Sequence, residues 1–183
     1  NTQGIDHVVL ERGRIAERWR TERWDSLVAN GPAWHDRFPG MAFTCDGDAF
    51  ADKECVTRYF EDYAEMINAP VRTGVTVEHA RPHDDRTGFL IETSQGSIDA
   101  RNLICATGPF QKPAIPFIIP ETPGLTQIHS TAYRNPNALP DGAVLVIGGG
   151  SSGSQITAEL HNAGRKVFFS IGPHDRLPRR YRR

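Results

Sequence analysis

Residues 144–153 of the chain read VLVIGGGSSG, an apolar run that ends in a glycine-rich turn. Gly148, Gly150 and Gly153 fit the spacing GxGxxG, which marks a nucleotide-binding turn when it joins a strand to a helix. In such turns the first glycine makes the tight bend, the second lets a diphosphate approach the backbone, and the third lets the helix pack against the strand. The sequence therefore predicts a dinucleotide site here, and a loop that is merely rich in glycine is the alternative.

The sequence on both sides of the turn supports the nucleotide interpretation. Residues 143–147 predict a buried strand, residues 154–163 a helix with Ile156 and Leu160 on one face, and residues 166–170 the next strand. The free amides and the positive end of the predicted helix would face the phosphates.

The residues beyond the second strand indicate which nucleotide binds. An NAD site is expected to carry an acidic residue about 20 positions after the first glycine. That count falls on residues 168–170, which end in Ser170 and contain no carboxylate. Arg176 and Arg179 follow, and their guanidinium groups favour the 2′-phosphate of NADPH. The alternative is that these arginines belong to a solvated tail.

The first part of the chain predicts strands on both sides of one long helix. A short buried strand at residues 8–10 ends on Glu11, and residues 52–68 have helical spacing with Asp52 as the cap. A strand at residues 71–79 and a hairpin ending in a buried strand at residues 103–105 follow. Five prolines between residues 109 and 123 then predict a stiff connector.

Composition narrows the class of protein. The 183 residues are 38% hydrophobic with a net charge of −1, so neither nucleic acid nor an anionic membrane is an expected partner. No apolar run is long enough to span a bilayer, and no export leader is visible. The three cysteines have no metal-ligand spacing, and no metal site is expected. Together these features favour a cytoplasmic protein with reduced thiols.

Glu11 has the position of a ribose-binding carboxylate at the end of a strand. The matching glycine turn would lie about 20 residues earlier, which is before Asn1. On its own, a residue such as Glu11 is more often a surface acid than a ribose ligand.

The order of several short segments resembles the first half of the class B flavoprotein monooxygenases. The resemblance covers nearly the whole chain, and after Glu11 it rests on Arg18-Trp19-Arg20, Arg23-Trp24, Phe38-Pro39-Gly40, Ala106-Thr107-Gly108, His129-Ser130 and Tyr133-Arg134, followed by the glycine turn.

The resemblance implies an α/β fold with two Rossmann-like dinucleotide-binding domains, one for FAD and one for NADPH, both incomplete in this chain. Residues 1–112 would form a partial FAD domain without its first strand and glycine turn. Residues 113–142 would be the connector, and residues 143–183 would begin the NADPH domain.

The resemblance also implies roles for individual residues. Glu11 would meet the adenosine ribose of FAD, and Asn30 would lie near the flavin as the active-site asparagine. The other expected cofactor-binding residues are Arg18, Trp19, Trp24, Thr107 and Gly108 for FAD, and Gly148, Gly150, Ser151, Ser152, Gly153, Ser170, Arg176 and Arg179 for NADPH.

The activity implied by the resemblance is hydride transfer from NADPH to FAD, followed by oxygen insertion into a small organic substrate through a C4a-(hydro)peroxyflavin. The Baeyer–Villiger signature is incomplete around His129, which favours N- or S-oxygenation over ketone oxidation. The alternatives are an NADP-dependent flavoprotein reductase and a non-catalytic nucleotide-binding remnant. A disulfide reductase would want a redox CxxC pair, and Cys45 and Cys55 are too far apart in sequence to supply one.

Overall fold

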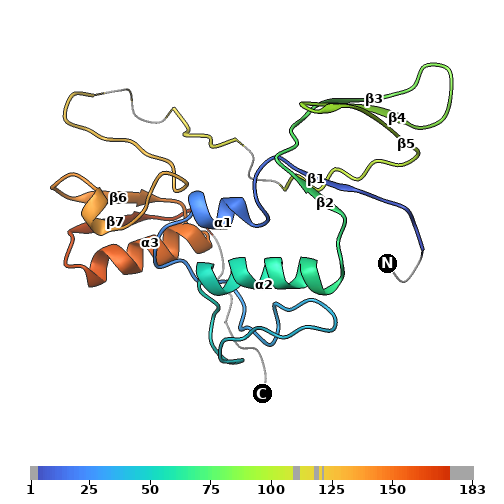
Figure 1. Cartoon of the computed structure of the whole chain (residues 1–183). Coiled ribbons are helices and arrows are strands. Elements are labelled where there is room, and N and C mark those ends of the chain that lie inside the picture. Colours follow the sequence, from blue (N-terminus) through green and yellow to red (C-terminus); the bar gives the residue numbers. More distant parts are fainter. Residues whose placement is uncertain (1–3, 109–111, 118–119, 121, 174–183) are drawn as a thin grey trace. The chain divides into compact units, whose positions relative to one another are not determined.

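The computed structural model describes residues 4–108, 112–117, 120 and 122–173. The elements run in the order β1, α1, α2, β2, β3, β4, β5, a 3-10 turn, β6, α3 and β7 (Figure 1). They fall into two compact units. The first unit comprises Asn1–Glu17 and Thr57–Lys112, and the second comprises Arg18–Val56 and Pro113–Arg183.

The first unit contains two small sheets. One is a parallel pair, β1 with β2, in which Val9 lies opposite Val71. The other is an antiparallel sheet with β4 between β3 and β5, and its central Ile91 is buried. The strands are β1 (Val9–Glu11), β2 (Val71–Thr73), β3 (Val77–Pro82), β4 (Phe89–Thr93) and β5 (Gly96–Ala100).

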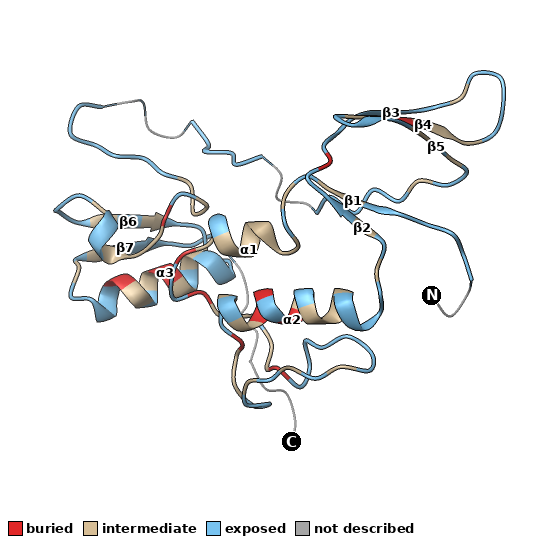
Figure 2. Cartoon of the chain, viewed as in Figure 1, coloured by how far each residue is buried: buried red, intermediate tan, exposed pale blue. Residues whose placement is uncertain are grey.

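The second unit holds the strand–helix–strand unit that the sequence predicts. β6 (Val144–Ile147) and β7 (Val167–Ser170) pair in parallel, and α3 (Ser151–Asn162) connects them. Such a connection buries one face of the strands under the helix. Figure 2 shows the buried positions of α3, which are Ile156 and Leu160. The core cluster that includes them also contains Trp24, Leu27 and Tyr133.

Helix α2 (Lys53–Met66) confirms the predicted helix and its cap. Asp52 Oδ1 accepts a hydrogen bond from Cys55 N at 2.7 Å, which satisfies one of the amides left over in the first helical turn. Val56 and Tyr59, three residues apart, are both buried. The shorter α1 (Glu17–Thr21) precedes α2 in the chain and contains no buried residue.

Two strand predictions were wrong. Residues 71–79 form no single strand, because Gly74 takes a positive φ of 73° and separates β2 from β3, which belong to different sheets. Residues 103–105 are not a strand, and Ile104 is 86% exposed. A strand needs a hydrogen-bonded neighbour, and within the described residues none pairs with this segment.

The predicted burial of two strands also needs correction. Val8 and Val9 are exposed, although β1 ends on Glu11 as expected. In β6, Val144 and Val146 pack against the core, whereas Leu145 and Ile147 are exposed. Apolar residues at every position predict burial on both faces, but in the described part of the chain only one face of β6 is covered.

Candidate nucleotide site at the glycine turn

The turn begins where β6 ends. Gly148 has a φ of 108°, a conformation that favours glycine because it lacks a Cβ atom. Its amide donates to the carbonyl of Ser170 at 2.9 Å, which continues the β6–β7 ladder by one bond. This geometry confirms the tight bend predicted at Gly148. It also brings Ser170, at the carboxyl end of β7, beside the start of the turn.

Gly150 is the N-cap of α3 and leaves the helix end open. It has no side chain, and a Cβ atom added there would meet nothing within 4 Å. The first helical turn contains Ser151 and Ser152, both exposed, and no acidic residue. Amides in a first turn lack helical acceptors and carry the positive end of the helix dipole. This end of the helix is therefore open, and its free amides carry partial positive charge.

Gly153 is where the helix and the strand end approach most closely. A Cβ atom added there would overlap the carbonyl oxygen of Gly148 at 1.9 Å and would lie 3.6 Å from the ring of Phe169. The oxygen belongs to the backbone and cannot rotate away, so only glycine fits. The structure thus gives the third glycine the packing role that the sequence assigns to it.

Two side chains of α3 attach the helix to the rest of the second unit. Tyr133 donates its hydroxyl hydrogen to Glu159 Oε2 at 2.7 Å. Burial, followed by the nearby Glu159 carboxylate, raises the pKa of Tyr133 well above its ordinary value. Gln155 makes two hydrogen bonds to the backbone of Val28. Sequence analysis did not find these contacts, because each joins residues more than 25 positions apart.

Three of the residues expected to bind FAD, namely Glu11, Thr107 and Gly108, lie in the first unit. Glu11 closes β1, and its Oε1 accepts from Gly13 N at 2.7 Å, which fixes the carboxylate at the strand end. Thr107 and Gly108 are exposed, and Gly108 has a φ of 76°.

The residues predicted to lie along the FAD are partly used for packing in the second unit. Arg18 pairs with Glu22 at 2.5 Å, and the guanidinium of Arg23 lies 5.8 Å from the ring centre of Trp19. Trp24 is only 3% exposed, and its indole nitrogen meets no hydrogen-bond acceptor among the described residues. Cofactor contact by Arg18, Trp19 and Trp24 stays a prediction.

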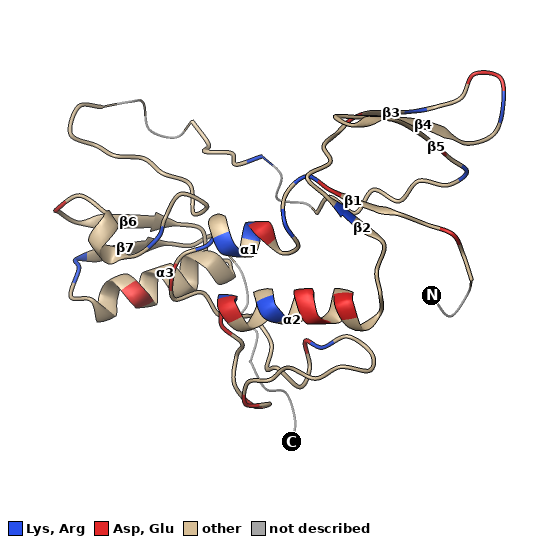
Figure 3. Ribbon diagram, viewed as in Figure 1, with Lys and Arg blue, Asp and Glu red and all other residues tan. Residues whose placement is uncertain are grey.

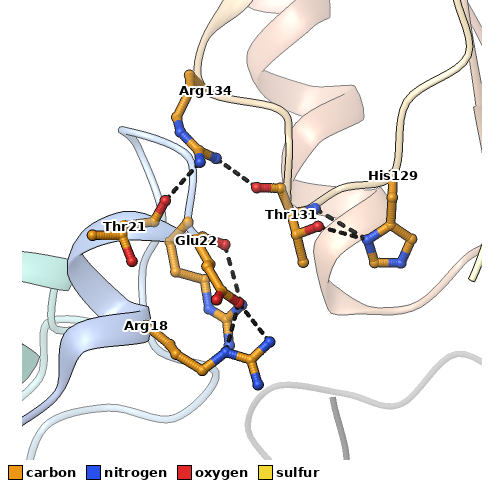
Figure 4. Close-up of polar contacts among 7 residues, drawn as sticks. Arg18, Thr21, Glu22, His129, Thr131 and Arg134 are labelled. Atoms are coloured by element: carbon orange, nitrogen blue, oxygen red, sulfur yellow. Dashed lines mark hydrogen bonds and ion pairs between the residues drawn. The ribbon is translucent and has the colours of Figure 1, made fainter. Parts of the chain in front are cut away.

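Arg134 is one of the residues on which the family resemblance rests, and the structure shows that it holds backbone segments together. Its guanidinium donates to the carbonyl oxygens of Thr21, Thr131 and Tyr133 at 2.6, 2.7 and 2.9 Å. Figure 4 shows this arginine reaching toward α1, while the ring of His129 turns to Thr131. Basic residues also occupy α1 itself, as Figure 3 shows. Arg134 therefore joins the connector to α1, whereas Tyr133 joins it to α3.

Asn30 is exposed and lies in a loop fixed by backbone hydrogen bonds. Next to it, Ala29 N donates to Ala51 O at 2.7 Å and Gly31 N donates to Asp36 Oδ2 at 2.9 Å. Asn30 therefore belongs to the same compact unit as the glycine turn. Arg176 and Arg179 lie outside the described residues.

The structure brings together two cysteines that are ten positions apart in the sequence. Burial, and then the neighbouring Cys55 thiol, raise the pKa of Cys45 to about 11. Spacing along the chain was therefore no guide to their distance in space. Both thiols are half-buried and reduced. Within the described residues no cluster of three metal-ligating side chains occurs, and no helix is both long and apolar enough to cross a bilayer.

A parallel strand–turn–helix–strand unit is the arrangement found in nucleotide-binding α/β proteins. Residues 1–177 match the family described as pyridine nucleotide-disulphide oxidoreductase, and the chain belongs to that family. The α/β fold expected from the sequence is thereby confirmed.

Two similar proteins are an oxidoreductase and a probable monooxygenase. The chain is 38% identical over 166 residues to an uncharacterized CzcO-like oxidoreductase from Geobacillus kaustophilus, covering 90% of this chain and 47% of the relative. It is 29% identical over 167 residues to the probable indole-3-pyruvate monooxygenase YUCCA4 from Arabidopsis thaliana, covering 87% and 39%. The chain therefore spans less than half the length of either relative.

Solved structures share the fold. A flavin-containing monooxygenase from Stenotrophomonas maltophilia superimposes with a TM-score of 0.75 at 22% identity, covering 91% of this chain and 57% of that one. The bacillithiol disulfide reductase Bdr from Staphylococcus aureus gives 0.79 at 18% identity, covering 97% and 53%. The resemblance to flavin monooxygenases is confirmed, alongside a fold shared with disulfide reductases.

Proposed function

We propose that this chain is part of an FAD- and NADPH-dependent monooxygenase that acts on a small organic substrate in the cytoplasm. The observation that carries the proposal is the turn from residue 148 to residue 153. Gly148 makes the bend, Gly150 leaves open space beside the backbone, and Gly153 lies close against the carbonyl of Gly148. A diphosphate site of this type requires these three features. The flavin monooxygenases among the relatives and solved structures supply the class of reaction.

The residues of the second unit fit a dinucleotide phosphate. The open backbone at Gly150 and the first-turn amides of α3 would hold the diphosphate, with the hydroxyls of Ser151 and Ser152 beside them. Ser170 stands where an NAD site would carry its acidic residue, so no carboxylate at that position repels a 2′-phosphate. Arg176 and Arg179 would complete the phosphate contacts.

The residues proposed for FAD offer complementary chemistry. The Glu11 carboxylate, oriented by Gly13, would accept hydrogen bonds from ribose hydroxyls. Thr107 and Gly108 would approach the cofactor through exposed backbone, and Asn30 would face the flavin with its exposed carboxamide. Arg18, Trp19 and Trp24 would line this cofactor.

The two cofactors, when bound, supply hydride transfer and the activation of oxygen for insertion into the substrate. The chain's own residues bind and orient them, and no side-chain nucleophile is needed. Placement matters because hydride transfer depends steeply on the distance between the reacting atoms.

A reductase without oxygenation is the second candidate, favoured by the proximity of Cys45 and Cys55 and by the fold shared with Bdr. Redox-active thiols react as thiolates and usually have a lowered pKa. Cys45 has the opposite shift, to about 11. We therefore prefer the monooxygenase.

The substitution Gly150→Ala in the full-length protein tests the diphosphate site. A Cβ atom at residue 150 meets no protein atom within 4 Å, so the fold should tolerate it. The methyl group would instead crowd a diphosphate against the backbone. We expect the Kd for NADPH, measured by titration, to rise about tenfold, equivalent to ~1.4 kcal/mol.

Gly47→Ala is the matched control, because a Cβ atom there also meets nothing within 4 Å, far from the turn in sequence. Its NADPH affinity should equal that of the wild type. Equal affinity in both variants would refute a diphosphate at the turn. Wild-type protein that binds NADPH but consumes no oxygen with any amine, thioether or ketone would favour the reductase if NADPH reduces its flavin, and the non-catalytic remnant if it does not.

A further inference from the structure

Gln155 lies two residues after Gly153 and makes a two-point contact with a distant loop. Its Nε2 donates to Val28 O at 3.1 Å, and its Oε1 accepts from Val28 N at 3.3 Å. The carboxamide thereby satisfies both backbone groups of Val28, as a neighbouring strand would. Its side chain is only half-buried. The contact joins the start of α3 to a segment 127 positions away.

The segment that Gln155 contacts is fixed on its other side too. Val28 forms an antiparallel bridge with Asp52, and Ala29 N donates to Ala51 O at 2.7 Å. The preceding residue, Leu27, is buried in the core cluster together with Ile156, the neighbour of Gln155. Residues 27–29 are therefore held between α3 and the segment before α2. Asn30 follows immediately.

We propose that Gln155 is a positioning residue that sets the distance between the glycine turn and the loop carrying Asn30. The proposal rests on the function proposed above, in which the turn holds the NADPH diphosphate and Asn30 faces the flavin. Gln155 touches neither cofactor in this role. It acts through Val28. The contact would keep the loop that carries Asn30 at a constant distance from the glycine turn, and therefore from a nucleotide bound there.

The chemistry of the contact requires a carboxamide. Only an amide side chain presents one donor and one acceptor to the donor and acceptor of a single residue. In Gln155→Glu the shape is kept, but the carboxylate has no hydrogen to donate to Val28 O. The two oxygens would then repel each other, and the loop would lose one of its attachments. Gln155→Glu therefore tests the contact with little change in volume.

The first measurement is flavin reduction in the full-length holoenzyme, followed by stopped-flow absorbance over a range of NADPH concentrations. We expect Gln155→Glu and Gln155→Ala to lower the limiting reduction rate about 10- to 100-fold, because small misplacements of reacting groups have effects of that order. The Kd for NADPH, which reports on the turn itself, should change by less than about threefold, since the turn keeps its own contacts.

The second measurement is independent of activity. Amide hydrogen exchange across residues 27–31 of the apoprotein should be faster in both Gln155 variants than in the wild type. Glu159→Gln is the matched control, since Glu159 lies one turn further along α3 and contacts Tyr133 instead of Val28. Its exchange in residues 27–31 and its reduction rate should remain those of the wild type.

The outcomes separate this inference from the proposed function. Wild-type rates and wild-type exchange in the Gln155 variants would overturn the positioning role. Equal losses in the Gln155 variants and in Glu159→Gln would also overturn it, because they would reveal only a general loosening of α3. If NADPH does not reduce the flavin of the wild-type holoenzyme, the proposed function is wrong, whatever the exchange data show.

Discussion

The described part of the chain contains two parallel strand pairs, and they differ in how well the connection between their strands covers them. β6 and β7 are connected by a helix whose buried residues, Ile156 and Leu160, join the core of the same unit. β1 and β2 are also parallel, but Val9 remains 45% exposed. A parallel pair is well ordered by local sequence when the helix that connects its strands also buries one of their faces. The β6–β7 pair meets this condition, and the β1–β2 pair does not.

The largest expected effect comes from Gly153→Ala. The new Cβ atom would lie 1.9 Å from the carbonyl oxygen of Gly148, so α3 or the strand end must move. Overpacking of this kind costs about 1–3 kcal/mol, and a clash with fixed backbone belongs at the upper end. We expect a clear drop in the midpoint of thermal unfolding of the full-length protein. An unchanged midpoint would mean that helix and strand are not in contact.

An intermediate effect is expected from Tyr133→Phe, which removes the hydroxyl bonded to Glu159. The loss should be about 1–2 kcal/mol in the free energy of unfolding, measured with urea. Glu159→Gln keeps an acceptor for the hydroxyl and should lose less.

The same pair predicts a pH dependence. The pKa of Tyr133 is raised in the folded state, above an unfolded value of about 10. The protonated hydroxyl therefore contributes its full stability below pH 10, and this contribution is lost as the pH rises further. Tyr133→Phe should flatten that part of the alkaline unfolding curve, and identical curves for variant and wild type would contradict the assignment.

The smallest effect should come from Gly13→Ala, the counterpart of Gly153 at the end of β1. Its Cβ atom would lie 2.9 Å from Glu17 Cγ and 3.0 Å from Glu17 Cβ, so the Glu17 side chain must shift, but no backbone atom lies in the way. We expect a loss of about 1 kcal/mol or less, at the lower end of the cost of overpacking. If Gly13→Ala lowered the free energy of unfolding as much as Gly153→Ala, the ends of β1 and β6 would be equally tightly packed, and the contrast drawn between the two strand pairs would be wrong.

Sequence reasoning succeeded where structure is local. The glycine spacing, the Asp52 cap and the apolar face of α3 each act within a few residues, and all three appear in the structure. It failed at Leu103–Cys105, because an apolar run predicts a strand only if a partner lies beside it. It also missed the contact of Gln155 with Val28 and the proximity of the two cysteines, since both depend on how distant segments meet.

The glycine turn has a consequence for altering the nucleotide preference. At Gly148, Gly150 and Gly153 the surface offered to a ligand is main chain, and one of these positions admits no other residue. Main-chain amides treat the diphosphates of NADH and NADPH alike. In the proposed site, discrimination between the two coenzymes would then fall to side chains from the end of β7 onward, beginning with Ser170. In that site, substitutions at the glycines would weaken the binding of both coenzymes, whereas substitutions beyond the strand could exchange one coenzyme for the other.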